Sequence, residues 1–386
     1  MKQFFCVLLA GLLLMGCAEK EAPALPSLPQ PPQDAATIPT DPSSDSATTP
    51  SIQPDPTEAL LSQMSLEELV GQLFLARCPE GTALEDIEAY HLAGFVLFAQ
   101  DFQKETPNSV TETIRSYQSS SKIPMLIAVD EEGGKVTRVS SYKAFRNQPF
   151  PAPRKLYAQS GIEGLLFAER EKAALLTSLG INVNLAPVCD LSNDPNDFIY
   201  ARSLGLDPET TGQVVSQMVA TMDSYGLGSV LKHFPGYGGN ADTHTGIAVD
   251  RRPLETLERA DLVPFRLAID SGCGAIMVSH NIVTAMDAEL PASLSPAVHR
   301  YLREEMGFSG VVITDDLVMD AISDVYGVGE AAVMAVNAGN DLLCSTEYAA
   351  QYAAVLEAAK NGTISIETLQ NAVRRILNWK HSLGLL

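Results

Sequence analysis

The apolar run at residues 228–231 leads directly into Lys232 and His233, which open a glycine-rich loop that ends in Asp242 and His244. An imidazole has an unperturbed pKa of about 6.5, so His244 could donate a proton in one step and accept one in the next. Asp242 could accept a hydrogen bond from the other ring nitrogen and fix its tautomer. An Asp-x-His pair on its own is more often a turn or surface pair than a catalytic pair, but the preceding Lys-His-Phe-Pro-Gly at 232–236 favours proton-transfer chemistry.

A pair of carboxylates, Asp315 and Asp316, ends a second apolar run at residues 310–314. A carboxylate at the end of a buried strand has a fixed direction and limited exposure, which suits a nucleophile. Spacing alone does not choose between the two, and Asp316 could instead cap a following helix. Together the two groups of charged residues predict an enzyme, because a (β/α)8 barrel builds its active site at the carboxyl ends of its strands.

Eight short apolar runs bounded by turn residues predict the strands that would position these groups. They cover residues 71–77, 93–99, 124–130, 181–190, 228–233, 273–280, 310–315 and 340–345. Amphipathic segments that could cross back over a parallel sheet separate them, including residues 161–179, 208–225, 254–270, 296–306 and 327–338. This alternation predicts one (β/α)8 TIM-type barrel of the α/β class, a single catalytic domain at residues 57–386. A doubly wound sheet is less favoured, because no Gly-x-Gly-x-x-Gly turn follows the first strand.

The remaining histidines divide by their surroundings. His280 ends a predicted strand, as Asp190 also does, and for both a place in the pocket wall and a supporting role behind it stay open. The other three have helical or loop surroundings and are expected on the surface: His91, His299 and His381.

The first part of the chain is expected to lie outside the barrel. A positive start and a short apolar stretch at residues 4–15 predict a signal peptide at residues 1–16, because about a dozen apolar residues are too few to span a bilayer about 30 Å thick. Residues 14–17 resemble the lipobox of bacterial lipoproteins, which implies a lipidated Cys17; a plain secretory signal is the alternative. Residues 17–56 are rich in Pro, Ser and Thr, a composition that predicts an unfolded tether. The protein is therefore expected in the cell envelope, anchored to a membrane.

Composition limits the partners and the kinds of site. The formal net charge of −21 argues against a nucleic-acid partner, which requires a basic face. Apart from Cys6 and Cys17, the cysteines show neither the Cys-x-x-Cys spacing of a metal site nor the density of a disulfide framework. Buried free thiols are therefore expected at Cys78, Cys189, Cys273 and Cys344.

Five blocks of the chain resemble the signature motifs of glycoside hydrolase family 3, and within it the β-N-acetylglucosaminidase branch. They occur in the family's order: Val-Asp-Glu-Glu-Gly-Gly-Lys-Val-Thr-Arg at 129–138, Ala-Arg-Ser-Leu-Gly at 201–205, Lys-His-Phe-Pro-Gly at 232–236, Asp-Thr-His at 242–244 and Thr-Asp-Asp-Leu at 314–317. The similarity covers residues 57–386. Three positions depart from the commonest wording: Glu131 replaces glutamine, Lys135 replaces arginine, and Tyr237 stands where a second histidine is usual.

The resemblance implies a role for each motif residue. Asp315 would be the nucleophile, since the family places it directly after the Ser or Thr of its motif, and His244 with Asp242 would be the acid/base. Many members take their acid from a second domain; this chain ends at Leu386 after the last predicted helix, so the acid is expected within the barrel. The sugar-binding set would be Asp130, Arg138, Arg202, Lys232 and His233. No cofactor and no metal are implied.

The function expected from this resemblance is that of a retaining β-N-acetylglucosaminidase (β-N-acetylhexosaminidase). It would remove non-reducing terminal β-linked N-acetylglucosamine through a covalent glycosyl-enzyme, with peptidoglycan fragments as the natural substrate candidate. Within the family, a phosphorylase or a β-glucosidase is the alternative. Outside it, the alternatives are a non-catalytic glycan-binding lipoprotein and a metal-dependent hydrolase with the ligands His233, His244, His280 and Asp315.

The lipobox generates a first testable prediction. Cys17→Ser should release the protein from the membrane fraction with unchanged specific activity, because one acyl chain binds only marginally while the several chains of a lipoprotein hold firmly. Membrane and soluble fractions of cells that produce either form are compared by immunoblot and by assay. Equal membrane recovery of the two forms would rule the anchor out.

Overall fold

The computed structural model describes residues 56–239, 242–243 and 246–386. The chain divides into two units, residues 1–52 and 53–386, and only the second contains described residues. The predicted signal peptide, Cys17 and His244 therefore lie outside the described residues. None of the helices formed by the described residues has the length and apolarity needed to cross a bilayer.

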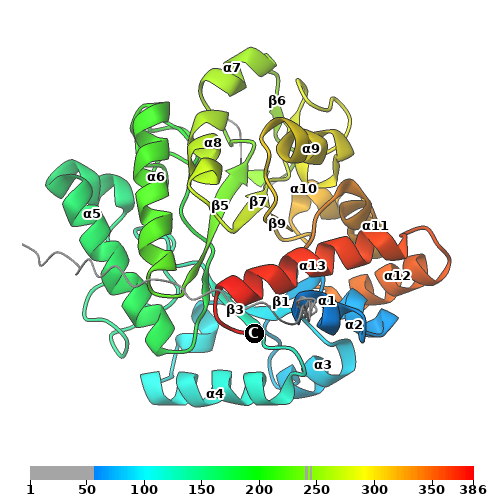
Figure 1. Cartoon of the computed structure of the whole chain (residues 1–386). Coiled ribbons are helices and arrows are strands. Elements are labelled where there is room, and N and C mark those ends of the chain that lie inside the picture. The colour runs from blue at the N-terminus through cyan, green and yellow to red at the C-terminus, as the bar shows by residue number, and fades with distance from the viewer. Residues whose placement is uncertain (1–55, 240–241, 244–245) are drawn as a thin grey trace, which may run out of the picture. The chain divides into compact units, whose positions relative to one another are not determined.

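Eight parallel strands form one sheet in the order β10-β1-β2-β3-β4-β5-β7-β9 (Figure 1). Their bounds are β1 (Phe74–Arg77), β2 (Gly94–Leu97), β3 (Leu126–Val129), β4 (Val183–Asn184), β5 (Gly228–Phe234), β7 (Ala275–Val278), β9 (Val311–Thr314) and β10 (Leu343–Ser345). A parallel bridge between Ile313 and Leu342 joins the two ends of the sheet. Each predicted apolar run corresponds to one of these strands, β5 extending one residue beyond its run, and the predicted TIM-type barrel is confirmed.

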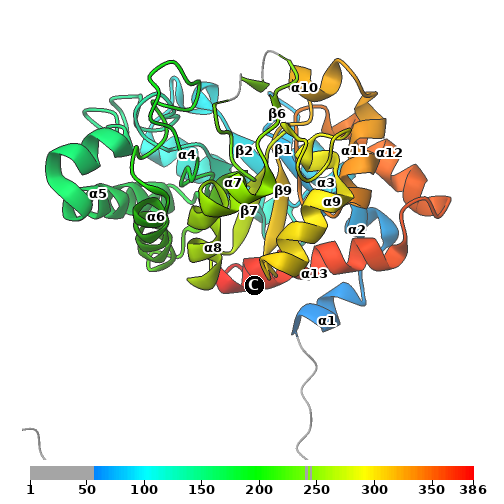
Figure 2. The ribbon, with the colours of Figure 1, turned by 90° about the horizontal axis from the view of Figure 1, so that it is seen from above.

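Helices cover the outer face of the barrel and strand side chains fill its interior, so the strands are buried on both faces and are continuous apolar runs. The helices are α1 (Pro56–Leu61), α2 (Leu66–Gly71), α3 (Ala83–Tyr90), α4 (Pro107–Ser120), α5 (Pro153–Ser178), α6 (Pro208–Asp223), α7 (Leu254–Arg259), α8 (Leu262–Asp270), α9 (Pro296–Arg300), α10 (Asp320–Ser323), α11 (Val328–Ala338), α12 (Tyr348–Lys360) and α13 (Ile366–Ser382). A small parallel pair, β6 (Val249–Asp250) with β8 (Ile282–Val283), lies at the end of the barrel away from α13 (Figure 2).

Two predicted elements differ from the structure for local reasons. The helix expected at residues 254–270 is broken between α7 and α8, where the buried carboxylate of Asp261 accepts hydrogen bonds from Arg252 at 2.8 and 3.0 Å. The strand expected at residues 181–190 is only β4, because the Ala186 N–H turns back to the Asn184 carbonyl at 2.8 Å, and pairing with β5 resumes as a bridge between Val188 and Lys232. Both differences arise from local hydrogen bonds within a correctly predicted segment.

Burial corrects one expectation for the histidines and supports that for the cysteines. His299 is buried rather than on the surface, since it packs against Gly339, where a Cβ would come within 3.2 Å of it. Burial lowers the pKa of His299, whose Nδ1 hydrogen-bonds the Ser295 carbonyl at 2.8 Å. Cysteines 78, 189, 273 and 344 are free and buried, as expected.

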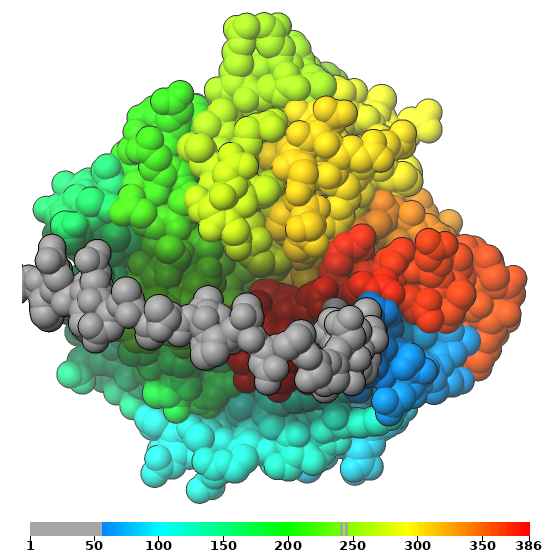
Figure 3. Space-filling model, in the orientation of Figure 1, coloured from blue at the N-terminus to red at the C-terminus, as the bar shows by residue number. Residues whose placement is uncertain are grey.

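Helix α13 lies across the end of the barrel where the strands begin (Figures 1 and 3). Its Trp379 packs so closely on the strand starts that a Cβ at Gly274 would come within 2.6 Å of the indole Nε1. The next residue, Lys380, is 0% exposed and donates to Gln72 Oε1 at 2.8 Å. Burial lowers the pKa of Lys380 to about 7.

Lys380 makes stability depend on pH in a defined direction. Its folded pKa of about 7 lies below the unfolded value of about 10.4, so between these values the unfolded chain binds more protons and stability rises with pH. Lys380→Met should therefore raise the melting temperature at pH 6, where the folded protein must bury the charge, and should raise it less at pH 9. Thermal unfolding at both pH values tests this, with exposed Lys104→Met as the control. An equal effect of Lys380→Met at the two pH values would contradict it.

Candidate active site

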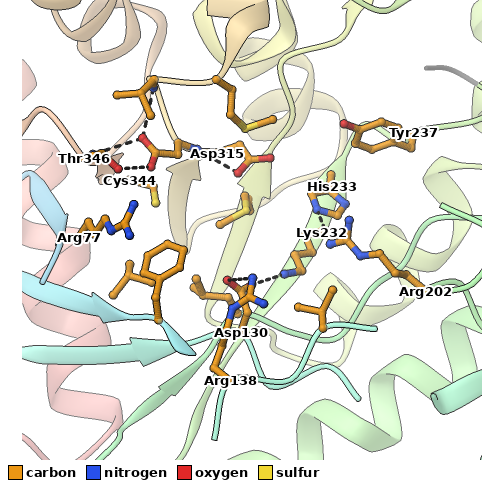
Figure 4. Close-up of a pocket in the computed structure, with 18 of the residues that line it drawn as sticks. Arg77, Asp130, Arg138, Arg202, Lys232, His233, Tyr237, Asp315, Cys344 and Thr346 are labelled. Atoms are coloured by element: carbon orange, nitrogen blue, oxygen red, sulfur yellow. Dashed lines mark hydrogen bonds and ion pairs between the residues drawn. The ribbon is translucent and has the colours of Figure 1, made fainter. Parts of the chain in front are cut away.

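The carboxyl ends of the strands enclose a cavity of about 430 Å³ (Figure 4). Its wall contains six of the predicted site residues, contributed by β5 and by the segments that follow β3, β4 and β9: Asp130, Arg138, Arg202, Lys232, His233 and Asp315. Asp242 is half-buried on the loop after β5. The structure thus gathers predicted residues that lie up to 185 positions apart in the chain (315 − 130) into one site.

Lys232 is the centre of a charged network in the wall of the cavity. The side chain is 2% exposed, and its Nζ lies 2.7 Å from both Asp130 Oδ1 and Glu132 Oε1. Burial alone would lower the pKa of Lys232, but the two carboxylates outweigh it and raise this pKa. The ammonium is therefore charged and donates to both carboxylates, which fixes the direction of Asp130.

Arg202 completes this network from the loop between β4 and α6. It grips Glu132 with two hydrogen bonds, Nε to Oε2 at 3.0 Å and Nη2 to Oε1 at 2.7 Å. Burial alone would raise the pKa of Glu132, but Lys232 and Arg202 outweigh it and lower this pKa. Glu132 is thus an ionised carboxylate that holds both cations at the cavity wall.

His233 has its tautomer fixed by its neighbours. Its Nε2 lies 3.2 Å from Arg202 Nη2, and because a guanidinium only donates, Nε2 must accept. The ring proton is then on Nδ1, which donates to Asp190 Oδ2 at 2.7 Å. Asp190 also accepts from the backbone N–H groups of His233 and Tyr237, at 3.1 and 2.7 Å. Of the two roles left open for Asp190, the structure shows the supporting one, behind His233.

The two carboxylates after β9 differ in their engagement. The carboxylate of Asp316 accepts from the Thr346 hydroxyl at 2.6 Å and from the N–H groups of Thr346 and Val318 at 3.3 and 3.2 Å. Burial raises the pKa of Asp316 against these bonds. The carboxylate of Asp315 accepts from the Asp316 N–H at 2.9 Å and faces the cavity above Lys232 and Asp130 (Figure 4). This arrangement favours Asp315 over Asp316 as the reacting group.

His280 supports the loop after β9 and does not line the cavity. Its Nε2 lies 3.0 Å from the carbonyl oxygen of Asp316, and its Nδ1 lies 2.7 Å from the Ser293 hydroxyl. Within the described part of the chain, no three His, Cys, Asp or Glu side chains are grouped so that they could hold a metal ion. The ring nitrogens of His233 and His280 instead contact protein groups.

Three residues of the site were not predicted from the sequence. Glu132 belongs to the first motif block, but nothing in the pattern distinguished it from Glu131, which accepts from the N–H groups of Arg138 and Val139 at 2.8 and 2.7 Å and so holds the loop that carries Arg138. Arg77 ends β1, a strand-end position that could have signalled it. Tyr237 was noted only as a departure from the family, yet it lines the cavity.

The family match and the similar proteins of known sequence point to the same group of enzymes. Residues 65–379 match the family described as glycosyl hydrolase family 3 N terminal domain. The β-hexosaminidase of Xanthomonas campestris pv. campestris (strain B100) is 34% identical over 297 residues, 75% of this chain and 87% of that protein. β-Hexosaminidase A of Pseudoalteromonas piscicida is 32% identical over 333 residues, 78% of this chain but only 55% of that longer protein.

Similar solved structures belong to the same family. The family 3 β-N-acetylglucosaminidase of Paenibacillus sp. str. FPU-7 superposes with a TM-score of 0.78 at 34% identity, over 83% of this chain and 63% of that chain. LpqI of Mycobacterium tuberculosis gives a TM-score of 0.76 at 29% identity, over 84% of this chain and 96% of that chain. The matches confirm the family and the glycoside hydrolase class predicted from the sequence. The chain belongs to glycoside hydrolase family 3, in the group whose curated relatives are β-hexosaminidases.

Proposed function

We propose that the protein is a retaining β-N-acetylglucosaminidase that removes non-reducing terminal β-linked N-acetylglucosamine. The observation that carries this proposal is the position of Asp315 on the cavity wall above the Lys232–Asp130–Glu132–Arg202 network (Figure 4). The network presents both donors and acceptors to the hydroxyls of one sugar, while Asp315 supplies a carboxylate for its anomeric carbon.

In the proposed first step, the Asp315 carboxylate attacks the anomeric carbon as the bond to the leaving oxygen breaks. The acid gives its proton to that oxygen, so a glycosyl ester of Asp315 and a free alcohol result. Water then attacks the same carbon, the acid/base takes a proton from it, and Asp315 regains its charge with net retention. The Asp242–His244 pair is the proposed acid/base, because an imidazole can serve in both directions near neutral pH.

Peptidoglycan fragments are the substrate class that the two guanidinium groups beside Phe98 suit. Arg77 lies over the Phe98 ring, 4.7 Å from its centroid, and Arg138 lies 5.8 Å from the same centroid. Arg77 Nη2 donates to Oε1 of the neutral Gln100 side chain at 3.2 Å. An aromatic ring flanked by guanidinium groups fits a leaving group that offers both a sugar face and a carboxylate, as muramic acid does.

A lipid tether at Cys17 would keep such an enzyme in the cell envelope, where peptidoglycan fragments arise. The support for it is the sequence alone: a short apolar leader, the lipobox-like residues 14–17 and a Pro, Ser and Thr-rich segment. The tether would let the catalytic domain reach soluble fragments while it remains at the membrane.

Asp315→Ala should abolish turnover of a chromogenic β-N-acetylglucosaminide while the melting temperature stays close to that of wild type. Loss of a covalent nucleophile removes many kcal/mol of transition-state stabilisation, at about 1.4 kcal/mol per tenfold in rate. Wild type should cleave this substrate faster than the β-glucoside, without need of phosphate and in the presence of a chelator. Phosphate-dependent turnover would instead indicate a phosphorylase, and no turnover would indicate a binding protein.

Asp316→Asn is the matched control for this assay, since the amide oxygen can still accept from the N–H groups of Thr346 and Val318 while the amide NH2 donates to the Thr346 hydroxyl. It should keep measurable turnover. An inactive Asp316→Asn protein beside an active Asp315→Ala protein would reverse the assignment of the nucleophile.

The acid/base assignment predicts a dependence on the leaving group. Dinitrophenolate leaves without much protonation, so His244→Ala should lose far less in the first step with a dinitrophenyl substrate than with a natural disaccharide. Asp242→Ala should show the same pattern more mildly, because the imidazole remains. Pre-steady-state release of dinitrophenol is compared with disaccharide cleavage for wild type and both variants. Equal losses on the two substrates would mean that another residue supplies the proton.

A further inference from the structure

Tyr237 is packed on the side of the cavity that holds His233 (Figure 4). The side chain is 1% exposed, and its ring stands edge-on to the His233 ring with centroids 5.3 Å apart. On another side it contacts Phe198, at a centroid distance of 5.5 Å. Its backbone N–H donates to Asp190, the carboxylate that also fixes His233. The position of the Tyr237 ring is thus set by the same groups that orient the sugar-binding histidine.

The hydroxyl of Tyr237 reaches forward along the chain to Thr243. It accepts from the Thr243 N–H at 3.1 Å and shares a further hydrogen bond with the Thr243 hydroxyl. Thr243 is fully buried, and it is the residue between the two members of the Asp-x-His pair. The peptide that follows Asp242 is therefore held by two bonds to one phenol.

The backbone on both sides of Tyr237 is also closely packed. Gly236 has a φ of 118°, and a Cβ there would come within 2.7 Å of the Asp261 side chain. Gly238 has a φ of 57°, and a Cβ there would come within 2.4 Å of the Arg252 guanidinium. Both glycines are needed for close approach to the Arg252–Asp261 ion pair, which fixes the loop on either side of Tyr237.

The phenol remains a neutral hydrogen-bonding group in ordinary working conditions. Burial raises the pKa of Tyr237 to about 12, so its hydroxyl keeps its proton at neutral pH. A neutral phenol can both accept from the Thr243 N–H and share its own proton with the Thr243 hydroxyl.

We infer that Tyr237 is a positioning residue for proton transfer, which holds Asp242 in register with the sugar-binding wall by binding Thr243. Its ring packs against His233 and its hydroxyl binds Thr243, so it ties the loop to the sugar-binding wall. A preorganised acid spends less free energy on alignment in the transition state. The catalytic consequence rests on the proposed function, in which Asp242 and His244 form the acid/base.

The test compares Tyr237→Phe with Thr243→Val. Tyr237→Phe keeps the ring against His233 but removes both hydrogen bonds to Thr243, while Thr243→Val removes only the bond of the threonine hydroxyl. For a disaccharide with a poor leaving group, Tyr237→Phe should lower kcat about tenfold or more and Thr243→Val by less. KM should change little, and release of dinitrophenolate in the first step should fall by less than about threefold.

A double-mutant cycle shows whether the two side chains act together. The Tyr237→Phe, Thr243→Val protein should be no slower than Tyr237→Phe alone, because the bond that the valine removes is already lost. Tyr225→Phe, at an exposed tyrosine, is the matched control and should behave as wild type. Melting temperatures identify any variant that fails to fold; Thr243→Val carries the comparison if Tyr237→Phe is one of them.

Two results would overturn the inference. One is an equal loss of rate on the disaccharide and the dinitrophenyl substrate, which would mean a general structural role. The other is additive losses in the double variant, which would mean that Tyr237 and Thr243 act separately. A wild-type protein without acetylglucosaminidase activity would instead contradict the proposed function, so the two failures are distinguishable.

Discussion

The buried ammonium of Lys232 is the interaction on which the geometry of the site depends. A charge that is 2% exposed is tolerated only when it is paired, and here Asp130 and Glu132 each lie 2.7 Å away. These carboxylates follow β3 and Lys232 belongs to β5, so the pairing ties strand ends that are distant in the chain. Removing one partner of a buried pair typically costs about 3–5 kcal/mol. The groups that would bind sugar are thus also the groups that hold this end of the barrel together.

Much of the fold could be predicted because each barrel strand is buried on both faces and is therefore a continuous apolar run. The limits of β4 and of the helix at residues 254–270 could not, because they depend on the backbone turn from Ala186 to Asn184 and on the buried Arg252–Asp261 pair. His299 was misplaced for a related reason. Its burial depends on close packing with Gly339, a contact between segments that no local pattern reveals.

The candidate site could be predicted in part, since parallel strands bring their carboxyl ends together and so gather whatever side chains follow them. What could not be predicted was which of two similar residues contacts which partner. Glu131 and Glu132 are neighbours of one type, but one binds backbone N–H groups and the other binds Arg202 and Lys232. Asp190 likewise faces His233 rather than the cavity. Which way a side chain points depends on backbone geometry that residue type does not encode.

The same network leaves the cavity wall close to electroneutral, although the chain as a whole carries −21. Lys232 and Arg202 are matched by Asp130 and Glu132, so a neutral sugar gains hydrogen bonds there but little long-range attraction. Its affinity should then depend little on ionic strength, since the Debye length is about 8 Å at physiological salt. An anionic glycan has to approach a strongly anionic protein before it reaches Arg77. Its association rate should therefore rise with salt concentration, whereas that of a neutral glycan should not.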